Sequence, residues 1–255
     1  MQRASFIHKF NRSQEHLHAL DQAVKWWLGD EPYVVASEIN AESGFKEVVI
    51  TAQEQPPARF SLMAGDAIQN LRSTLDHLVV EIARVNSGGY LMERVERDIM
   101  FPITTSPQLF RNARKRGCLG CVPPRAQALI RLMQPYHNGD EWTRHPLWVL
   151  HQLSNIDKHR RLPLLQSTVP ELQVAKIRFR QVREFSLGAS GPFKDKAVLA
   201  SWDPDAEVEV DLRAVTVEVA FGEGTPLPGA PLLQSLADLS QIIRETVMDP
   251  LLRFT

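Results

Sequence analysis

SLMAGDAIQNLRSTLDHLVVEIARV, residues 61–85, is the stretch that decides the fold, because it holds the most regular apolar pattern in the chain. Branched apolar side chains recur there at intervals of three and four residues, at Ile68, Leu71, Leu75, Leu78, Val79 and Ile82. At about 100° per residue these positions share one side of an α-helix. The pattern predicts a long helix with one buried face, which ends at Ser87-Gly88-Gly89.

The rest of the chain divides into helical and strand-like segments. Further helices are predicted over residues 11–28, 125–133, 146–161 and 232–247. A β-hairpin is predicted from residues 34–40 and 47–53. Alternating apolar and polar residues predict antiparallel strands over 172–182, 196–202, 207–212 and 215–221. Residues 98–124 are predicted to be irregular, with Phe101-Pro102-Ile103 extended.

These segments predict an α+β protein. We expect an N-terminal helical bundle portion with a small hairpin, residues 1–165, followed by a C-terminal antiparallel sheet and a closing helix, residues 166–255. The first portion carries the candidate site, and we expect the second to pack against it as one unit.

The composition excludes several classes of protein. With 255 residues, 44% of them hydrophobic, the chain can form an ordinary core without disulfides. Lys and Arg number 29 against 30 Asp and Glu, so a site for a polyanion must be a local patch. No apolar run approaches the roughly 18 residues of a membrane span, and the start lacks the apolar core of a signal peptide. We therefore expect a cytoplasmic protein with no membrane partner.

The first candidate constellation lies on the 61–85 helix. Arg72 and Asp76 fall on the border of the apolar stripe, and Ser73 and His77 lie farther round. One interpretation is structural: Arg72 and Asp76 form an ion pair at i, i+4, and His77 is a surface residue. The other is functional, because arginine binds phosphate with forked donors and histidine titrates near neutral pH.

The functional interpretation follows a family resemblance. Leu71-Arg72-Ser-Thr-Leu-Asp-His77 resembles the Arg-x4-6-His motif of the HEPN family, helical proteins that include metal-independent ribonucleases of toxin and defence systems. The resemblance implies a homodimer in which Arg72 and His77 of two protomers line one cleft. There Arg72 would bind the phosphate of RNA and His77 would act on the ribose hydroxyl.

The second constellation lies on the 146–161 helix. His151, Asn155 and His159 recur every fourth residue on the side opposite its apolar face, and His137 and His145 lie just upstream. The two histidines could serve as base and acid, with Lys158 or Arg160 stabilising a charged intermediate. The structural alternatives are a solvated helix face for the histidines and a buried ion pair between Asp157 and Arg160, Arg161 or Arg72.

Other patterns carry less weight. His151 and His159 are two turns apart, farther than one ion easily spans unless another residue intervenes, so we expect neither a metal nor a cofactor. Cys118-Leu-Gly-Cys121 has the spacing of half a zinc site or of a redox pair. The alternative interpretation is that the two cysteines are unpaired thiols. The run Arg111, Arg114, Lys115 and Arg116 is either a patch that contacts RNA phosphates or a solvated loop.

Taken together, the two constellations, Phe101-Pro102-Ile103 and His145-Pro-Leu-Trp148 resemble a group of uncharacterised bacterial proteins over residues 60–165, which implies a shared fold. The leading hypothesis is a HEPN-like protein that binds or cleaves RNA. Its predicted catalytic residues are Arg72, His77, His151 and His159, and its predicted substrate-binding residues are Ser73, Asn155, Lys158 and Arg160. The alternatives are a non-enzymatic binding or assembly protein that uses the same polar helix stripe, and a metal-dependent hydrolase.

Overall fold

The computed structural model describes residues 4–168, 178–180, 184–188, 191–209 and 217–255. The chain forms two compact units. Unit 1 consists of residues 1–20, 61–162 and 233–255, and unit 2 consists of residues 21–60 and 163–232. Each unit is therefore assembled from segments that lie far apart in the sequence.

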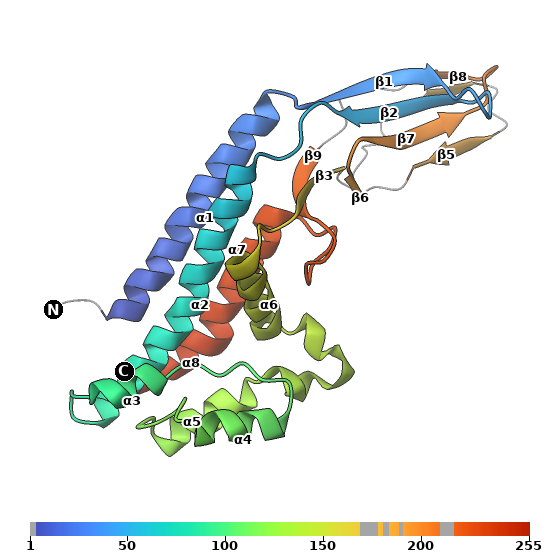
Figure 1. Cartoon of the computed structure of the whole chain (residues 1–255). Coiled ribbons are helices and arrows are strands. Elements are labelled where there is room, and N and C mark those ends of the chain that lie inside the picture. Colours follow the sequence, from blue (N-terminus) through green and yellow to red (C-terminus); the bar gives the residue numbers. More distant parts are fainter. Residues whose placement is uncertain (1–3, 169–177, 181–183, 189–190, 210–216) are drawn as a thin grey trace. The chain divides into compact units, whose positions relative to one another are not determined.

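Unit 1 is helical (Figure 1). Its long helices come from α1 (Ser5–Gly29), α2 (Ala58–Asn86), α6 (Pro146–His159) and α7 (Leu232–Ile243). Helix α7 continues through a π-helical turn (Arg244–Met248) into α8 (Asp249–Leu251) and a final 3-10 turn (Leu252–Phe254). The shorter elements are α3 (Glu93–Asp98), α4 (Pro107–Lys115), α5 (Pro124–Leu132) and the 3-10 segment η1 (Pro135–Arg144).

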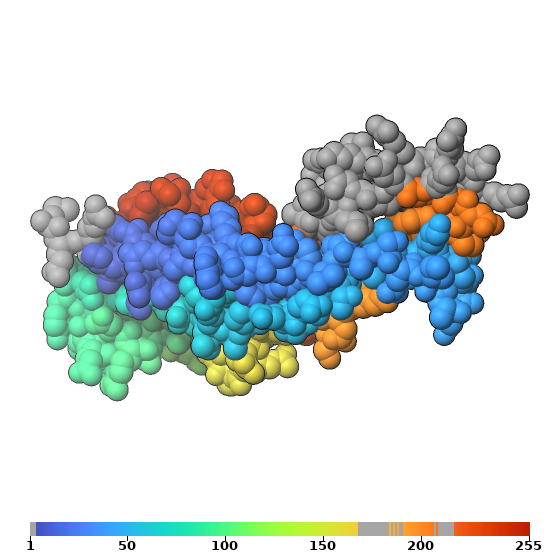
Figure 2. Space-filling model, turned by 90° about the horizontal axis from the view of Figure 1, so that it is seen from above, coloured from blue at the N-terminus to red at the C-terminus, as the bar shows by residue number. Residues whose placement is uncertain are grey.

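The apolar stripe of α2 lies in the core of unit 1. All six of its predicted core residues are at most 3% exposed, so the predicted helix and its buried face are confirmed. Leu147, Leu150 and Leu153 of α6 are fully buried in the same unit. Figure 2 shows the C-terminal segment lying against the first part of α1, where Gln14 Nε2 donates a hydrogen bond to Ser240 Oγ at 2.7 Å. Burial of one large apolar side chain stabilises the fold by about 1.5–3 kcal/mol, so these helices hold unit 1 together.

Helix α4 shows that the predicted irregular segment, residues 98–124, was wrong in part. Ser106 precedes the helix, and its Oγ accepts a hydrogen bond from the Leu109 N–H at 3.2 Å. Pro107 occupies the first turn, where a missing N–H costs nothing. Only Phe110 and Ala113 of this nine-residue helix are buried. Two buried apolar residues are too few to produce a visible helical period, so only Ser106 and Pro107 could have indicated the helix.

Unit 2 contains antiparallel sheets (Figure 1). The predicted hairpin is confirmed as β1 (Tyr33–Ile39) and β2 (Lys46–Ala52), paired from Tyr33 opposite Ala52 to Ile39 opposite Lys46. Strand β2 also pairs with β7 (Lys196–Trp202), which pairs with β5 (Phe185–Leu187). The second sheet has the order β6 (Gly191–Phe193), β3 (Leu164–Thr168), β9 (Val217–Phe221), and β4 (Arg178–Arg180) pairs with β8 (Glu207–Glu209).

The core of unit 2 lies on the sheet formed by β2 and β7. Val48 and Ile50 of β2 pack with Leu199, Ala200 and Trp202 of β7, all at most 3% exposed. The hairpin near the start of the chain is thus stabilised by a strand about 150 residues later.

The remaining predictions of secondary structure are largely confirmed. The structure contains the helices predicted at 125–133, 146–161 and 232–247 and the strand at 196–202. The described parts of 207–212 and 215–221 are strands β8 and β9. Of 172–182 only residues 178–180 are described, and they form β4; the rest lies outside the described residues. The α+β class is confirmed. Within the described residues, no helix combines the length and apolarity that crossing a membrane requires.

Candidate functional site

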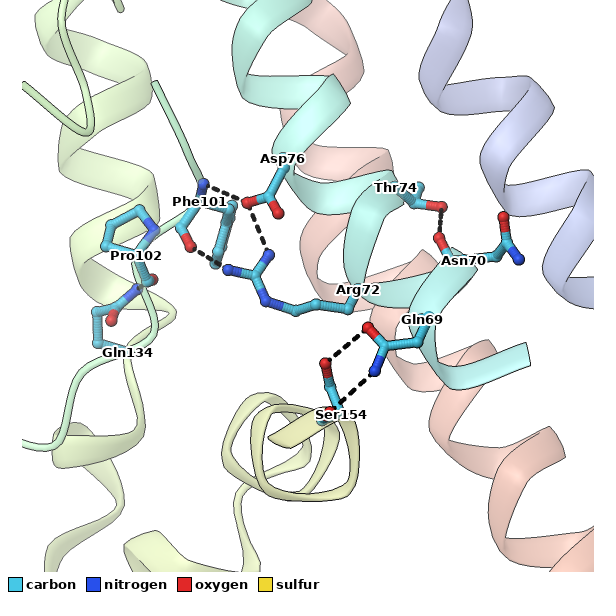
Figure 3. Close-up of polar contacts among 9 residues, drawn as sticks. All are labelled: Gln69, Asn70, Arg72, Thr74, Asp76, Phe101, Pro102, Gln134 and Ser154. Atoms are coloured by element: carbon cyan, nitrogen blue, oxygen red, sulfur yellow. Dashed lines mark hydrogen bonds and ion pairs between the residues drawn. The ribbon is translucent and has the colours of Figure 1, made fainter. Parts of the chain in front are cut away.

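Helices α2 and α6 bring the two polar segments of the sequence together (Figure 3). Gln69 of α2 donates from Nε2 to the carbonyl oxygen of Ser154 at 2.9 Å, and Ser154 Oγ donates to Gln69 Oε1 at 3.1 Å. The same Nε2 donates to Asp157 Oδ2 at 3.1 Å. Gly65 leaves room for this carboxylate, since a Cβ at residue 65 would lie 2.0 Å from Asp157 Oδ1. A network centred on one amide side chain therefore joins the two helices.

Arg72 and Asp76 hold the main chain of Phe101 (Figure 3). Arg72 Nη1 donates to Asp76 Oδ1 at 2.7 Å, which confirms the predicted i, i+4 ion pair. Arg72 Nη2 donates to the Phe101 carbonyl oxygen at 2.9 Å, and the Phe101 N–H donates to Asp76 Oδ1 at 2.9 Å. The Arg72 side chain is only 13% exposed and that of Asp76 34%. The pair thus satisfies both main-chain groups of a residue that belongs to no helix or strand.

Gln134 continues this support for the segment after Phe101. Its Oε1 accepts hydrogen bonds from the N–H and the hydroxyl of Thr104, each at 2.9 Å. Its Nε2 donates to the carbonyl oxygens of Pro102 at 2.9 Å and Ile130 at 3.0 Å. Gln134 is completely buried, so all of these groups depend on it rather than on water.

His77 lies on a different side of α2 and faces the start of α1. Its Nδ1 is 3.0 Å from Ser5 Oγ, and the ring is half-buried. Burial lowers the pKa of His77, Lys9 lowers it further, and the neighbouring Asp76 opposes the change. The imidazole is therefore neutral at pH 7.

His151 lies on α6 among cations. Asn155 Nδ2 donates to His151 Nε2 at 3.1 Å, which places the ring proton on Nδ1. The Trp148 ring packs nearby, with a centroid distance of 6.1 Å. Burial lowers the pKa of His151, and Arg72 and Lys158 lower it further against the weaker opposing effect of Asp76.

His145 has a structural role at the start of α6. Its Nδ1 accepts a hydrogen bond from the Leu147 N–H at 3.2 Å, as an N-terminal cap does. Burial lowers the pKa of His145 as well. His77, His145 and His151 are half-buried and have lowered pKa values, so all are neutral near pH 7; they are called here the three half-buried histidines. His16 on α1 is half-buried as well, and His159 is exposed at the end of α6.

The structure brings only some of the predicted site residues together. His151 shares its neighbourhood with Arg72, Asn155 and Lys158, while His77 contacts α1 and Ser73 is half-buried on α2. His159, Lys158 and Arg160 are exposed at the end of α6. No contact between two histidines of this set is found in the described part of the chain.

The structural alternative of a buried ion pair at Asp157 is not found among the described residues. Asp157 bonds to Gln69, and Arg72, which was one of its expected partners, pairs with Asp76 on its own helix. Gln69 and Gln134 were not predicted as site residues, since a glutamine, whether within a helical pattern or just after one, looks like any solvated residue. Gly65 did give a signal, because a glycine inside a strongly helical pattern often marks a close approach.

The possible metal ligands and the two thiols were compared with the sequence expectations. Within the described ranges, no group of three or more His, Cys, Asp and Glu side chains is placed to hold a metal ion. Cys118 and Cys121 are both free; Cys118 is buried and Cys121 exposed. Burial raises the pKa of the Cys118 thiol, which makes it less reactive than an ordinary cysteine.

The chain was compared with known protein families, curated proteins and solved structures. No protein-family model matches this chain, and neither a curated protein nor a solved structure is significantly similar to it.

Proposed function

We propose that this chain binds RNA through unit 1 and does not cleave it. The distribution of charge carries the proposal. Unit 1 has 19 Lys and Arg against 13 Asp and Glu, whereas unit 2 has 10 against 17. The near-neutral total thus conceals one cationic and one anionic unit. Local positive charge supplies most of the affinity of proteins for nucleic acids.

The exposed side of α6 offers groups of the right kind in unit 1. Lys158 is an exposed cation, and Asn155 and the Nδ1 proton of His151 are hydrogen-bond donors on the same side of the helix. Such groups bind phosphate and sugar oxygens, which account for most contacts between proteins and nucleic acids.

The geometry favours binding over proton transfer. Cleavage by paired histidines requires one neutral and one protonated ring within reach of the same ribose and phosphate. The three half-buried histidines all have lowered pKa values, so none of them is the protonated partner. Asp76 acts on both His77 and His151, but no contact between two of these rings is found among the described residues. Arg72, the arginine of the HEPN-like motif, already bonds to Asp76 and Phe101.

A metal-independent ribonuclease is the second candidate, and one observation favours it. The neutral His151 lies near Arg72 and Lys158, which is a suitable setting for a general base beside a bound phosphate. The general acid would then come from a second copy of the chain, in a homodimer of the kind that the HEPN resemblance implies.

One titration distinguishes the two candidates. Fluorescence anisotropy of a labelled single-stranded RNA of about ten nucleotides measures binding, and a denaturing gel of the same samples, with a metal chelator present, measures cleavage. We expect binding that weakens with salt, intact RNA, and weaker binding by Lys158→Ala. Lys25→Ala removes an exposed lysine of unit 2 and is the matched control.

The outcomes are distinct. Wild-type protein that fails to bind RNA at low salt would contradict the proposal. Cleavage in the presence of chelator that disappears in His151→Ala would instead establish the ribonuclease.

A further inference from the structure

A long part of unit 1 contains cations and no carboxylates. Residues 99–139 include six Lys and Arg and not a single Asp or Glu. This stretch includes α4 and α5 (Figure 1), and residues of both helices line the same hollows. On α4, Arg111 and Arg114 are three residues apart and so share one face of the helix.

Two hollows are lined in part by these two arginines. One has a volume of about 390 Å³ and is lined by Arg111, Arg114 and Lys115 together with Leu119, Gly120 and Gln127. The other has a volume of about 380 Å³, and its walls include Arg111, Arg114, Arg131, Tyr136 and His137. Both hollows are lined by Arg111 and Arg114, and the two hollows together are called here the α4–α5 groove.

The cations of the α4–α5 groove are not neutralised by neighbouring carboxylates. Arg111, Arg114, Lys115 and Arg131 are exposed, and no ion pair to any of them is found among the described residues. Other arginines of the same unit behave differently. Arg12 pairs with Glu15, Arg84 with Glu81 and Glu96, and Arg144 with Glu141.

Aromatic rings lie at one end of the groove. The rings of Tyr136 and His137 are 4.4 Å apart between centroids at an interplanar angle of 44°. His137 is exposed, and its Nε2 lies 3.1 Å from the carbonyl oxygen of Arg131. Tyr136 is half-buried. Cations beside accessible aromatic rings are the combination that binds single-stranded nucleic acids, whose unpaired bases stack on aromatic side chains.

We propose that the α4–α5 groove holds the backbone of single-stranded RNA. Arg111 and Arg114 bind phosphates where they line both hollows, Lys115 and Arg131 bind the neighbouring phosphates, and a base stacks on the Tyr136 and His137 rings. The identity of the polymer as RNA rests on the proposed function. The choice of a single strand rests on the rings, because a duplex keeps its bases from stacking on a protein side chain.

Two arginines of α5 provide a matched pair for the test. Arg131 lines the groove and Arg125 does not, and both are exposed. Binding of a labelled single-stranded RNA is measured by anisotropy over a range of salt concentrations for wild type, Arg114→Gln, Arg131→Glu and Arg125→Glu. Circular dichroism checks that each variant is folded. We expect Arg114→Gln and Arg131→Glu to bind more weakly and to lower the slope of log K against log salt by about 0.7 for each phosphate that is no longer bound. Arg125→Glu should bind with nearly the wild-type slope.

Two further measurements address the single strand. Tyr136→Leu keeps the apolar bulk but removes the stacking ring, and it should weaken binding about fivefold or more. A duplex of the same sequence should bind more weakly than the single strand. Equal affinity for the duplex would overturn the single-strand assignment.

Different results would contradict the groove as the binding site and RNA binding itself. If wild type binds RNA while Arg114→Gln and Arg131→Glu bind as tightly as Arg125→Glu, the groove is not the site, although RNA binding stands. If wild type does not bind RNA, the proposed function and the groove assignment are both wrong.

Discussion

Gly65→Ala tests the contact on which the arrangement of α2 and α6 depends. In an open position this change stabilises a helix by about 1 kcal/mol, because alanine loses less backbone entropy than glycine. At residue 65 the new Cβ would lie 2.0 Å from Asp157 Oδ1 and 2.6 Å from its Cγ. No side-chain atom tolerates such distances, so Asp157 must rotate away or the helices must separate.

The expected magnitude follows from the hydrogen bond that is broken. Rotation of Asp157 breaks its hydrogen bond with Gln69, and a hydrogen bond to a charged group contributes about 1.5–3 kcal/mol. After subtracting the gain of about 1 kcal/mol in helix propensity, we expect Gly65→Ala to lower the free energy of unfolding by about 0.5–2 kcal/mol.

Urea unfolding followed by circular dichroism measures this change, and a second substitution isolates its cause. Asp157→Ala removes the carboxylate, so Gly65→Ala made in that background should become stabilising by about 1 kcal/mol. Asp157→Asn keeps the shape of the side chain and should keep the clash, which separates a steric from an electrostatic effect. Gly29→Ala is a control, because a Cβ at residue 29 meets nothing within 4 Å.

An equal effect of Gly65→Ala in the wild-type chain and in the Asp157→Ala background would contradict this contact. Equal effects would mean that the carboxylate does not lie against the backbone of residue 65.

Three further predictions concern the same unit. Arg72→Ala should lower the free energy of unfolding by about 2 kcal/mol, because Asp76 and the Phe101 carbonyl lose their charged partner; an unchanged urea midpoint would argue that Arg72 is not structural. Gln134→Leu should cost at least about 2 kcal/mol, since it leaves buried main-chain groups of Thr104 and Pro102 unpaired, and a cost within error of zero would contradict that role. The three half-buried histidines have pKa values below those of the unfolded chain, so protons bind the unfolded state first as the pH falls. The stabilising contribution of these histidines should therefore be fully present above about pH 6.5 and should decrease below it. Urea midpoints measured across this range will show the decrease, and a midpoint that rises on acidification would contradict the lowered pKa values.

The helices that follow an apolar stripe were predictable, and those fixed by capping or long-range contacts were not. The six apolar residues of α2 repeat over several turns, so their common burial could be inferred from spacing alone. Helix α4 has only Phe110 and Ala113 as buried residues, and its start depends on Ser106. The pairing of β2 with β7 could not be predicted. Both segments alternate apolar and polar residues as any half-buried strand does, and no local sequence feature identifies the partner strand.

The candidate site divides in the same way. The Arg72 and Asp76 pair follows from a fixed spacing on one helix and was predicted. The hydrogen bonds to the main chain of Phe101 depend on the position of a loop 25 residues after Asp76. Residue spacing on a helix does not predict that position. The absence of carboxylates from residues 99–139 was visible in the sequence, yet its meaning depends on α4 and α5 lying together. The net charge of a whole chain can therefore hide a cationic unit, which becomes visible when the charges of each folded unit are counted separately.

Unit 1 is built from three segments that lie far apart in the sequence, and this affects how the protein folds during synthesis. Gln14 on α1 bonds to Ser240 on α7, and Leu236, Leu239 and Ile243 of α7 are buried in that unit. During translation the apolar surfaces of α1 and α2 are made long before α7 emerges from the ribosome to cover them. Nascent chains of this protein should therefore depend on chaperones until the last helix is released, and ribosome profiling of chaperone-bound chains would detect that interval.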